Sequence, residues 1–121
     1  MDTPFFQVCK ANPTVQALLG GVLPRIYPFG QAPQDVAKPY VVYQWIGGSP
    51  FNMINCRPDA DRASLQVDVY GLTTQSTTQV AKAIRYAIEL DSYLTGYRGD
   101  MRDEETKLYR TSFDVDWLVK R

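Results

Sequence analysis

Histidine is absent from the 121 residues of the chain. Its absence removes the commonest general base, the Ser–His and Cys–His nucleophile pairs, and the commonest zinc ligand. Cysteine is scarce, because only Cys9 and Cys56 occur, and two distant thiols cannot form a thiolate zinc site. A glycine-rich phosphate loop is also lacking, since Gly20-Gly21 and Gly47-Gly48 have neither its pattern nor its lysine. The sequence therefore shows no catalytic, cofactor-binding or metal-binding motif.

Net charge is absent as well, because 13 lysine and arginine residues balance 13 aspartate and glutamate residues. General affinity for nucleic acid needs clustered positive charge, so this balance argues against it. A near-neutral chain also repels its own copies only weakly. No apolar run approaches the ~18 residues of a membrane span, and the first residues lack the basic start of a signal peptide. We expect a protein without membrane contact, made in a reducing cytoplasm with both thiols free and buried.

The length is that of one domain, and we expect residues 1–121 to form a single unit with one hydrophobic core. Residues 4–19 are predicted to be helical with a break, because Asn12-Pro13 is a typical helix start and Gly20-Gly21 a typical end. A second helix is predicted over residues 74–90. Its apolar face consists of Val80, Ala83, Ile84, Ala87 and Ile88.

Strands account for most of the remaining chain. Four prolines between residues 22 and 39 exclude a long helix there, although residues 25–27 are a candidate for a short edge strand. The main strands are expected at residues 40–46, 63–70, 93–102 and 108–119. In two of them apolar and polar residues alternate, which predicts one buried and one polar sheet face.

In order, the elements run helix, strand, strand, helix, strand, strand. This α-β-β-α-β-β order predicts an α+β fold, with an antiparallel sheet of about four strands and two helices packed on one face. The helix at 74–90 is expected to cover the apolar sheet face, while the polar face points outward. The predicted apolar face consists of Leu65, Val67, Val69, Phe113, Val115 and Trp117.

The polar face contains the candidate site residues. Asp114 and Asp116 alternate on one strand, which places their carboxylates roughly 7 Å apart, and Asp68 occupies the same kind of face on another strand. Three such carboxylates could bind a divalent cation and perform acid–base chemistry, as in a small metal-dependent hydrolase. Alternatively they only keep an outward sheet face solvated. Arg110 is the one cation expected beside them.

The connection at residues 47–62 is far longer than the about two to five residues usual in a hairpin. Its apolar residues are Phe51, Met53 and Ile54, followed by Arg57. An apolar tip on a long loop is a common way to reach a partner, so these four residues are interface candidates. The alternative is that the loop folds back and covers the edge of the core.

Several stretches of the chain follow a familiar order. An N-terminal helix is followed by PRIYP, by the strand PYVVYQWIGGSP and by the strand RASLQVDVYG. The helix TTQVAKAIRYAIEL and the strand LYRTSFDVDWLVKR complete it. This order resembles the tail terminator, or tail completion, proteins of long-tailed bacteriophages. The most specific pieces are Gly-Ser-Pro after the first long strand and QVDVYG before the helix.

The resemblance implies a small α+β virion protein with no enzyme activity and no cofactor. Copies of such a protein would form a ring, a hexamer, that caps the tail tube at the head–tail junction, stops its polymerisation and allows head attachment. Its partners would be other copies of itself, the tail tube protein and a head-completion or connector protein. It would reside in the virion, and in the host cytoplasm before assembly. Another neck, minor tail or connector subunit of similar fold is the alternative.

A ring at this junction must let DNA pass without specific binding. Carboxylates repel phosphates at close range, within a screening length of ~8 Å at physiological salt. We therefore expect the polar sheet face, with Asp68, Arg110, Asp114 and Asp116, to line the channel.

Overall fold

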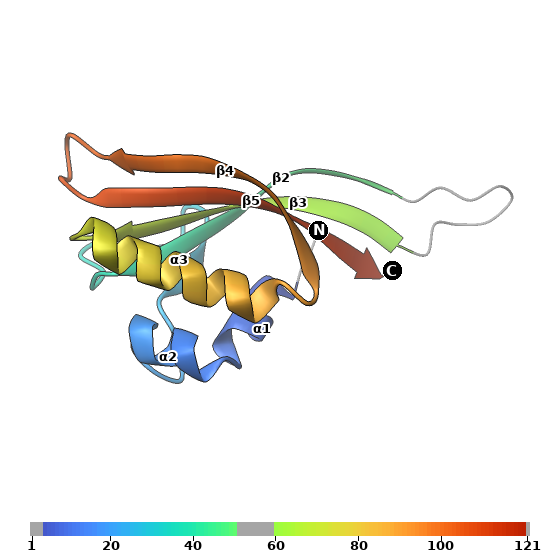
Figure 1. Ribbon diagram of the computed structural model, residues 1–121, viewed down its shortest axis with the longest axis horizontal. Helices are drawn as coiled ribbons and strands as arrows, with labels where there is room; N and C mark the ends of the chain where they lie inside the picture. The colour runs from blue at the N-terminus through green and yellow to red at the C-terminus, as the bar shows by residue number, and fades with distance from the viewer. Residues whose placement is uncertain (1–3, 51–59, 121) are drawn as a thin grey trace, which may run out of the picture.

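In the part of the chain that the structure describes, a five-stranded sheet forms one layer and three helices form the other, all on the same sheet face (Figure 1). The computed structural model describes residues 4–50 and 60–120. The elements are α1 (Phe5–Lys10), α2 (Pro13–Leu19), β1 (Ile26–Pro28), β2 (Tyr40–Pro50), β3 (Ala60–Gly71), α3 (Thr74–Ile88), β4 (Ser92–Arg102) and β5 (Tyr109–Lys120). The strand order across the sheet is β1-β2-β3-β5-β4. Within the described residues, no helix has the length and apolar character to span a membrane.

Strand β1 makes the sheet mixed, where the sequence predicts a purely antiparallel one. It pairs with β2 in parallel, with Ile26 opposite Val41, whereas the other three strand pairs are antiparallel. Parallel neighbours require the chain to return to the same end of the sheet, and residues 29–39 make that return. Arg25 fastens it, because its Nε donates to the carbonyl oxygen of Pro39 at 2.9 Å. The four predicted main strands are present and pair antiparallel, so the prediction is wrong only in lacking β1 as a fifth strand and its parallel pairing.

The N-terminal part contains two short helices, α1 and α2, where the sequence predicts one helical stretch over residues 4–19 with a break. As predicted, Asn12 begins α2, since its Oδ1 accepts hydrogen bonds from the backbone N–H groups of Thr14 and Val15 at 3.0 and 3.2 Å. Gly20 ends the helix at a φ of 103°, a left-handed conformation that glycine adopts without strain. The element order is thus α-α-β-β-β-α-β-β, one helix and one strand more than expected.

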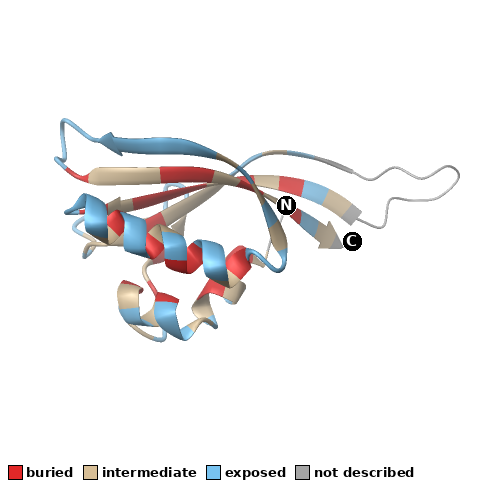
Figure 2. Ribbon diagram, viewed as in Figure 1, coloured by how far each residue is buried: buried red, intermediate tan, exposed pale blue. Residues whose placement is uncertain are grey.

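The contact between α3 and the sheet follows the prediction. The α3 side chains Val80, Ile84 and Ile88 are at most 1% exposed. The sheet residues predicted to face the helix are all buried, namely Leu65, Val67, Val69, Phe113, Val115 and Trp117. Figure 2 shows the buried residues concentrated between the helices and the sheet. One core between two layers therefore holds the chain together.

Strands β2 and β3 extend beyond the helical layer and form an arm, defined as residues 45–50 and 60–64 (Figure 1). The sequence predicts a loop at 47–62, but pairing continues to Pro50 opposite Asp61. Gly48 permits it, because a Cβ there would collide with the carbonyl oxygen of Arg62. The glycines that read as a strand end are therefore part of a strand, with a bulge between Trp45 and Gly47.

We expect Ile84→Asp to unfold the domain or to lower its stability severely. Ile84 is fully buried against the sheet, and burying a polar group without a hydrogen bond costs roughly 2–7 kcal/mol. Thermal melting followed by circular dichroism measures the effect. The control is Tyr86→Asp on the same helix, because Tyr86 is 73% exposed. A cooperative Ile84→Asp protein with an unchanged melting temperature would contradict the assigned packing.

Candidate assembly surfaces

The sheet face opposite the helices is the outer face, and it carries the four predicted channel residues. The register places Asp68 opposite Ser112, Asp114 opposite Gln66, and Asp116 opposite Ser64, so the alternation of both strands agrees. Arg110 lies further along the same face, opposite Tyr70. The structure therefore brings the three carboxylates and Arg110 onto one surface of β3 and β5.

Two further arginines, Arg98 and Arg62, also reach this face, which the sequence alone does not indicate. Arg98 donates from Nε to both carboxylate oxygens of Asp114, at 2.9 and 3.2 Å. This hydrogen bond and the negative charge of Asp114 raise the pKa of Arg98. Arg62 lies 3.9 Å from Asp116, whose carboxylate also accepts from the hydroxyl of Ser64 at 2.6 Å. The outer face is therefore closer to charge balance than the sequence indicates.

Asp68 lies near the centre of the outer face, with only 7% of its surface exposed. Its carboxylate accepts from the amide of Gln66 at 3.2 and 3.3 Å, and its neighbours across the sheet are Val42 and Ser112. The hydroxyl of Ser112 is buried and has no hydrogen-bond partner among the described residues. This polar pair is therefore packed within the sheet surface, whereas Asp114 and Asp116 on the same face are more exposed than Asp68.

The hydrolase interpretation requires a metal site. Across residues 4–50 and 60–120, no three His, Cys, Asp or Glu side chains are grouped so that they could hold a metal ion. Asp68, Asp114 and Asp116 therefore do not form the required site, and two of them are occupied by arginine and serine partners.

Cys9 is a core residue of α1 and shows no exposed surface. Burial raises the pKa of its thiol to about 12, so almost none is present as the nucleophilic thiolate at neutral pH. Cys9 is thus a structural apolar side chain, as expected. Cys56 lies outside the described residues.

The interface candidates Phe51, Met53, Ile54 and Arg57 also lie outside the described residues. The arm that leads to them is described, and it carries large exposed apolar side chains. Trp45 is 54% exposed and Ile46 is 43% exposed on β2, while Leu118 of β5, opposite Arg62 of the arm, is 53% exposed. Half-exposed aromatic and aliphatic groups on a projecting element are typical of association surfaces. From the sequence, Trp45 and Ile46 are predicted only as part of the strand at residues 40–46.

Comparison with known proteins gives one family and a fold likeness. The family described as tail completion protein gp17 matches residues 3–120. A chain in the structure titled "Virion of native gene transfer agent (GTA) particle" superposes with a TM-score of 0.64 at 14% sequence identity. The match covers 97% of this chain and 92% of that chain, and at this identity it shows a shared fold. No curated protein matches the chain.

Proposed function

Because the chain belongs to the family of tail completion protein gp17, we propose that it ends the tail tube as a ring of identical subunits at the head–tail junction. The family match makes the chain a structural protein of the virion tail. In the proposed ring, six subunits stop tube polymerisation and offer a surface for head attachment. One side contacts the tail tube protein and the other a head-completion or connector protein. Before assembly, the subunits are in the host cytoplasm.

The observation that carries this proposal is the extent of the family match. It covers residues 3–120 of 121, so the match includes both layers of the domain and the arm. The fold likeness to a chain of a gene transfer agent virion extends over almost the same length. The exposed arm supports the proposal further, because a subunit that acts by assembly needs surface that it cannot bury alone.

The proposal predicts the particles made when the protein is missing. Phage from which its gene is deleted should produce overlong tails, or tails and heads that fail to join, because nothing ends the tube. Negative-stain electron microscopy measures both tail length and attachment, and the wild-type gene supplied separately is the control. Tails of normal length joined to heads would contradict the proposal. Normal tails on heads with an altered neck would instead favour the alternative, a connector subunit.

We further propose that residues Phe51, Met53, Ile54 and Arg57 contact a neighbouring subunit. Deleting Phe51–Ile54 should leave the melting temperature of the monomer nearly unchanged, since loop closure entropy varies slowly with length. Ring formation should fall, as measured by native mass spectrometry or by restoration of tail length in the deletion phage. The control variant keeps the full segment length and its apolar residues, and replaces Asn52 and Asn55 with serine. If the deletion melts the domain instead, the loop covers the core.

The outer face is the proposed lining of the channel, with Asp68, Arg110, Asp114 and Asp116. Its charge pairs support DNA passage without specific binding, because an arginine held by a carboxylate offers phosphate less net positive charge. Replacing Asp114 and Asp116 with lysine should leave tails and heads joined but slow DNA ejection and give the ring salt-sensitive DNA affinity.

The matched control replaces Glu104 and Glu105, in the exposed β4–β5 turn, with lysine. This variant makes the same change in net charge away from the outer face. Ejection is measured by dye release from DNA in purified particles, and affinity by filter binding at two salt concentrations. Normal ejection and no gain in affinity for the Asp114/Asp116 variant would contradict the channel assignment.

A further inference from the structure

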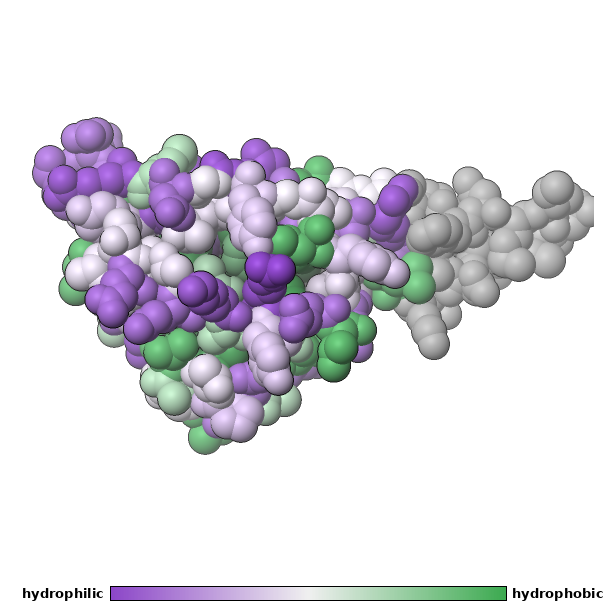
Figure 3. All heavy atoms as spheres, in the orientation of Figure 1, coloured by the Kyte–Doolittle hydropathy of each residue, from purple (hydrophilic) through white to green (hydrophobic). Residues whose placement is uncertain are grey.

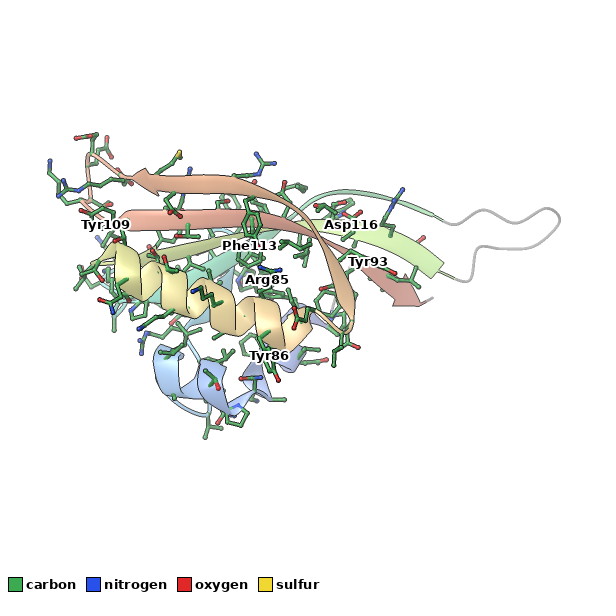
Figure 4. The ribbon with its side chains drawn as sticks, in the orientation of Figure 1. Arg85, Tyr86, Tyr93, Tyr109, Phe113 and Asp116 are labelled. Carbon is green, nitrogen blue, oxygen red and sulfur yellow. The ribbon has the colours of Figure 1, made fainter. Side chains whose placement is uncertain are left out.

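A groove separates α3 from strand β4 on the helical side of the sheet. It consists of two neighbouring hollows of about 190 and 220 Å³, which share Arg85 and Leu94 in their walls. Binding pockets for small molecules usually have ~300–1,000 Å³, so each hollow suits side chains rather than a whole ligand. In Figure 4, Arg85 lies between α3 and the strands, below Phe113. The groove therefore runs along much of α3, beside the strand at the edge of the sheet.

The groove exists because α3 packs mainly on β3 and β5 and only lightly on β4. Strand β4 has two register shifts against β5, between Leu94 and Gly96 and between Tyr97 and Gly99. The first shift changes the alternation, so that Tyr97 lies opposite Phe113 and on the helix side. There its hydroxyl accepts a hydrogen bond from Arg85 at 2.6 Å. The bulged strand leaves space beside the helix that residues 4–50 and 60–120 do not fill.

The walls of the groove combine an apolar floor with a polar rim. Ala81, Leu94 and Phe113 form the floor of the first hollow, while Lys82 and Arg85 stand at its rim. Figure 3 shows hydrophilic side chains scattered over this side of the molecule, with apolar surface exposed between them. Such a surface suits one or two apolar side chains from a segment that is otherwise polar.

We propose that this groove receives Phe51 and Met53 of a second copy of the chain. The segment 51–59 carries Phe51, Met53 and Ile54 among asparagines, which is the chemistry the groove fits. Both ends of this segment, Pro50 and Ala60, lie on the arm beyond α3 (Figure 1), whereas the groove is lined mainly by residues of α3, β4 and β5. In this proposal the segment therefore comes from a neighbouring copy. The contact is made by side chains, because the bulges of β4 interrupt the backbone pattern that strand pairing needs.

This contact joins two different surfaces of the same protein, the segment of one copy and the groove of the next. An interface of that kind repeats from subunit to subunit and closes into a ring when the rotation allows it. The inference thus rests on the proposed ring and adds which surfaces meet. It also gives the groove residues a role that the family match alone does not assign.

Filling the groove tests the inference. Thr78 is exposed and lines the first hollow, so Thr78→Trp should block entry of Phe51 without disturbing the core. We expect at least a ~10-fold loss of ring formation, as for the loss of an aromatic anchor at an interface centre. Gln79→Trp is the matched control, because Gln79 is exposed on the same helix and lines neither hollow. Both variants should melt at the same temperature.

Crosslinking gives a second measurement, which does not depend on filling the groove with a larger side chain. The variant Thr78→Cys places a thiol at the groove, and the native Cys56 provides one in the segment, while buried Cys9 stays unreactive. Assembled tails treated with a short bismaleimide should yield a ladder of covalent multimers, which Cys56→Ser abolishes. Gln79→Cys should yield no ladder.

The outcomes separate the inference from the proposed function. Normal tails formed by Thr78→Trp, together with no ladder from Thr78→Cys, would overturn the groove assignment and leave the ring proposal intact. If the wild-type protein neither forms rings nor restores tail length, the proposed function itself fails. A ladder that depends on both thiols, with loss of rings only in Thr78→Trp, supports the groove as the subunit contact.

Discussion

The packing of α3 across β3 and β5 is the interaction on which the rest of the structure depends. Val80, Ile84 and Ile88 lose almost all contact with solvent there, and the two strands beneath pair along their whole length. Because this contact buries the apolar side chains of β3 and β5 on one face, the alternating polar residues of these strands lie on the outer face. Because α3 is centred on β3 and β5, both β4 and the arm extend past its cover. The surfaces available for assembly are therefore consequences of where the core lies.

The sequence predicts this core well because the core residues follow the short repeats of strands and helices. Alternation along β3 and β5 and the spacing of apolar residues in α3 identify the buried faces directly. The two ends of α2 are equally predictable, because Asn12 and Gly20 cap the helix by hydrogen bonds to residues only a few positions away. Each of these signals depends on neighbours in the chain, so a single sequence contains them.

The features that the sequence does not predict depend on residues far away in the chain. Ile26 joins β2 in parallel, and no local pattern specifies the strand that a three-residue segment selects. Gly48 reads as a strand end, yet in the arm it allows the close approach of Arg62. Arg98 belongs to a bulge, and a bulge changes which face a side chain occupies. The charge pairs of the outer face could therefore not be predicted without the strand register. The interface candidates at residues 51–59 lie outside what the structure describes.

The bulges of β4 have one more consequence. An edge strand offers unpaired backbone groups to any extended chain, and a regular one promotes fibrous aggregation. Along β4 the pattern is broken twice, Gly99 has a φ of 88°, and Arg98, Asp100 and Arg102 place charges on the edge. Newly made copies that meet at high concentration thus find no continuous template on this strand. The same irregularity disfavours the growth of a continuous sheet from copy to copy along this edge.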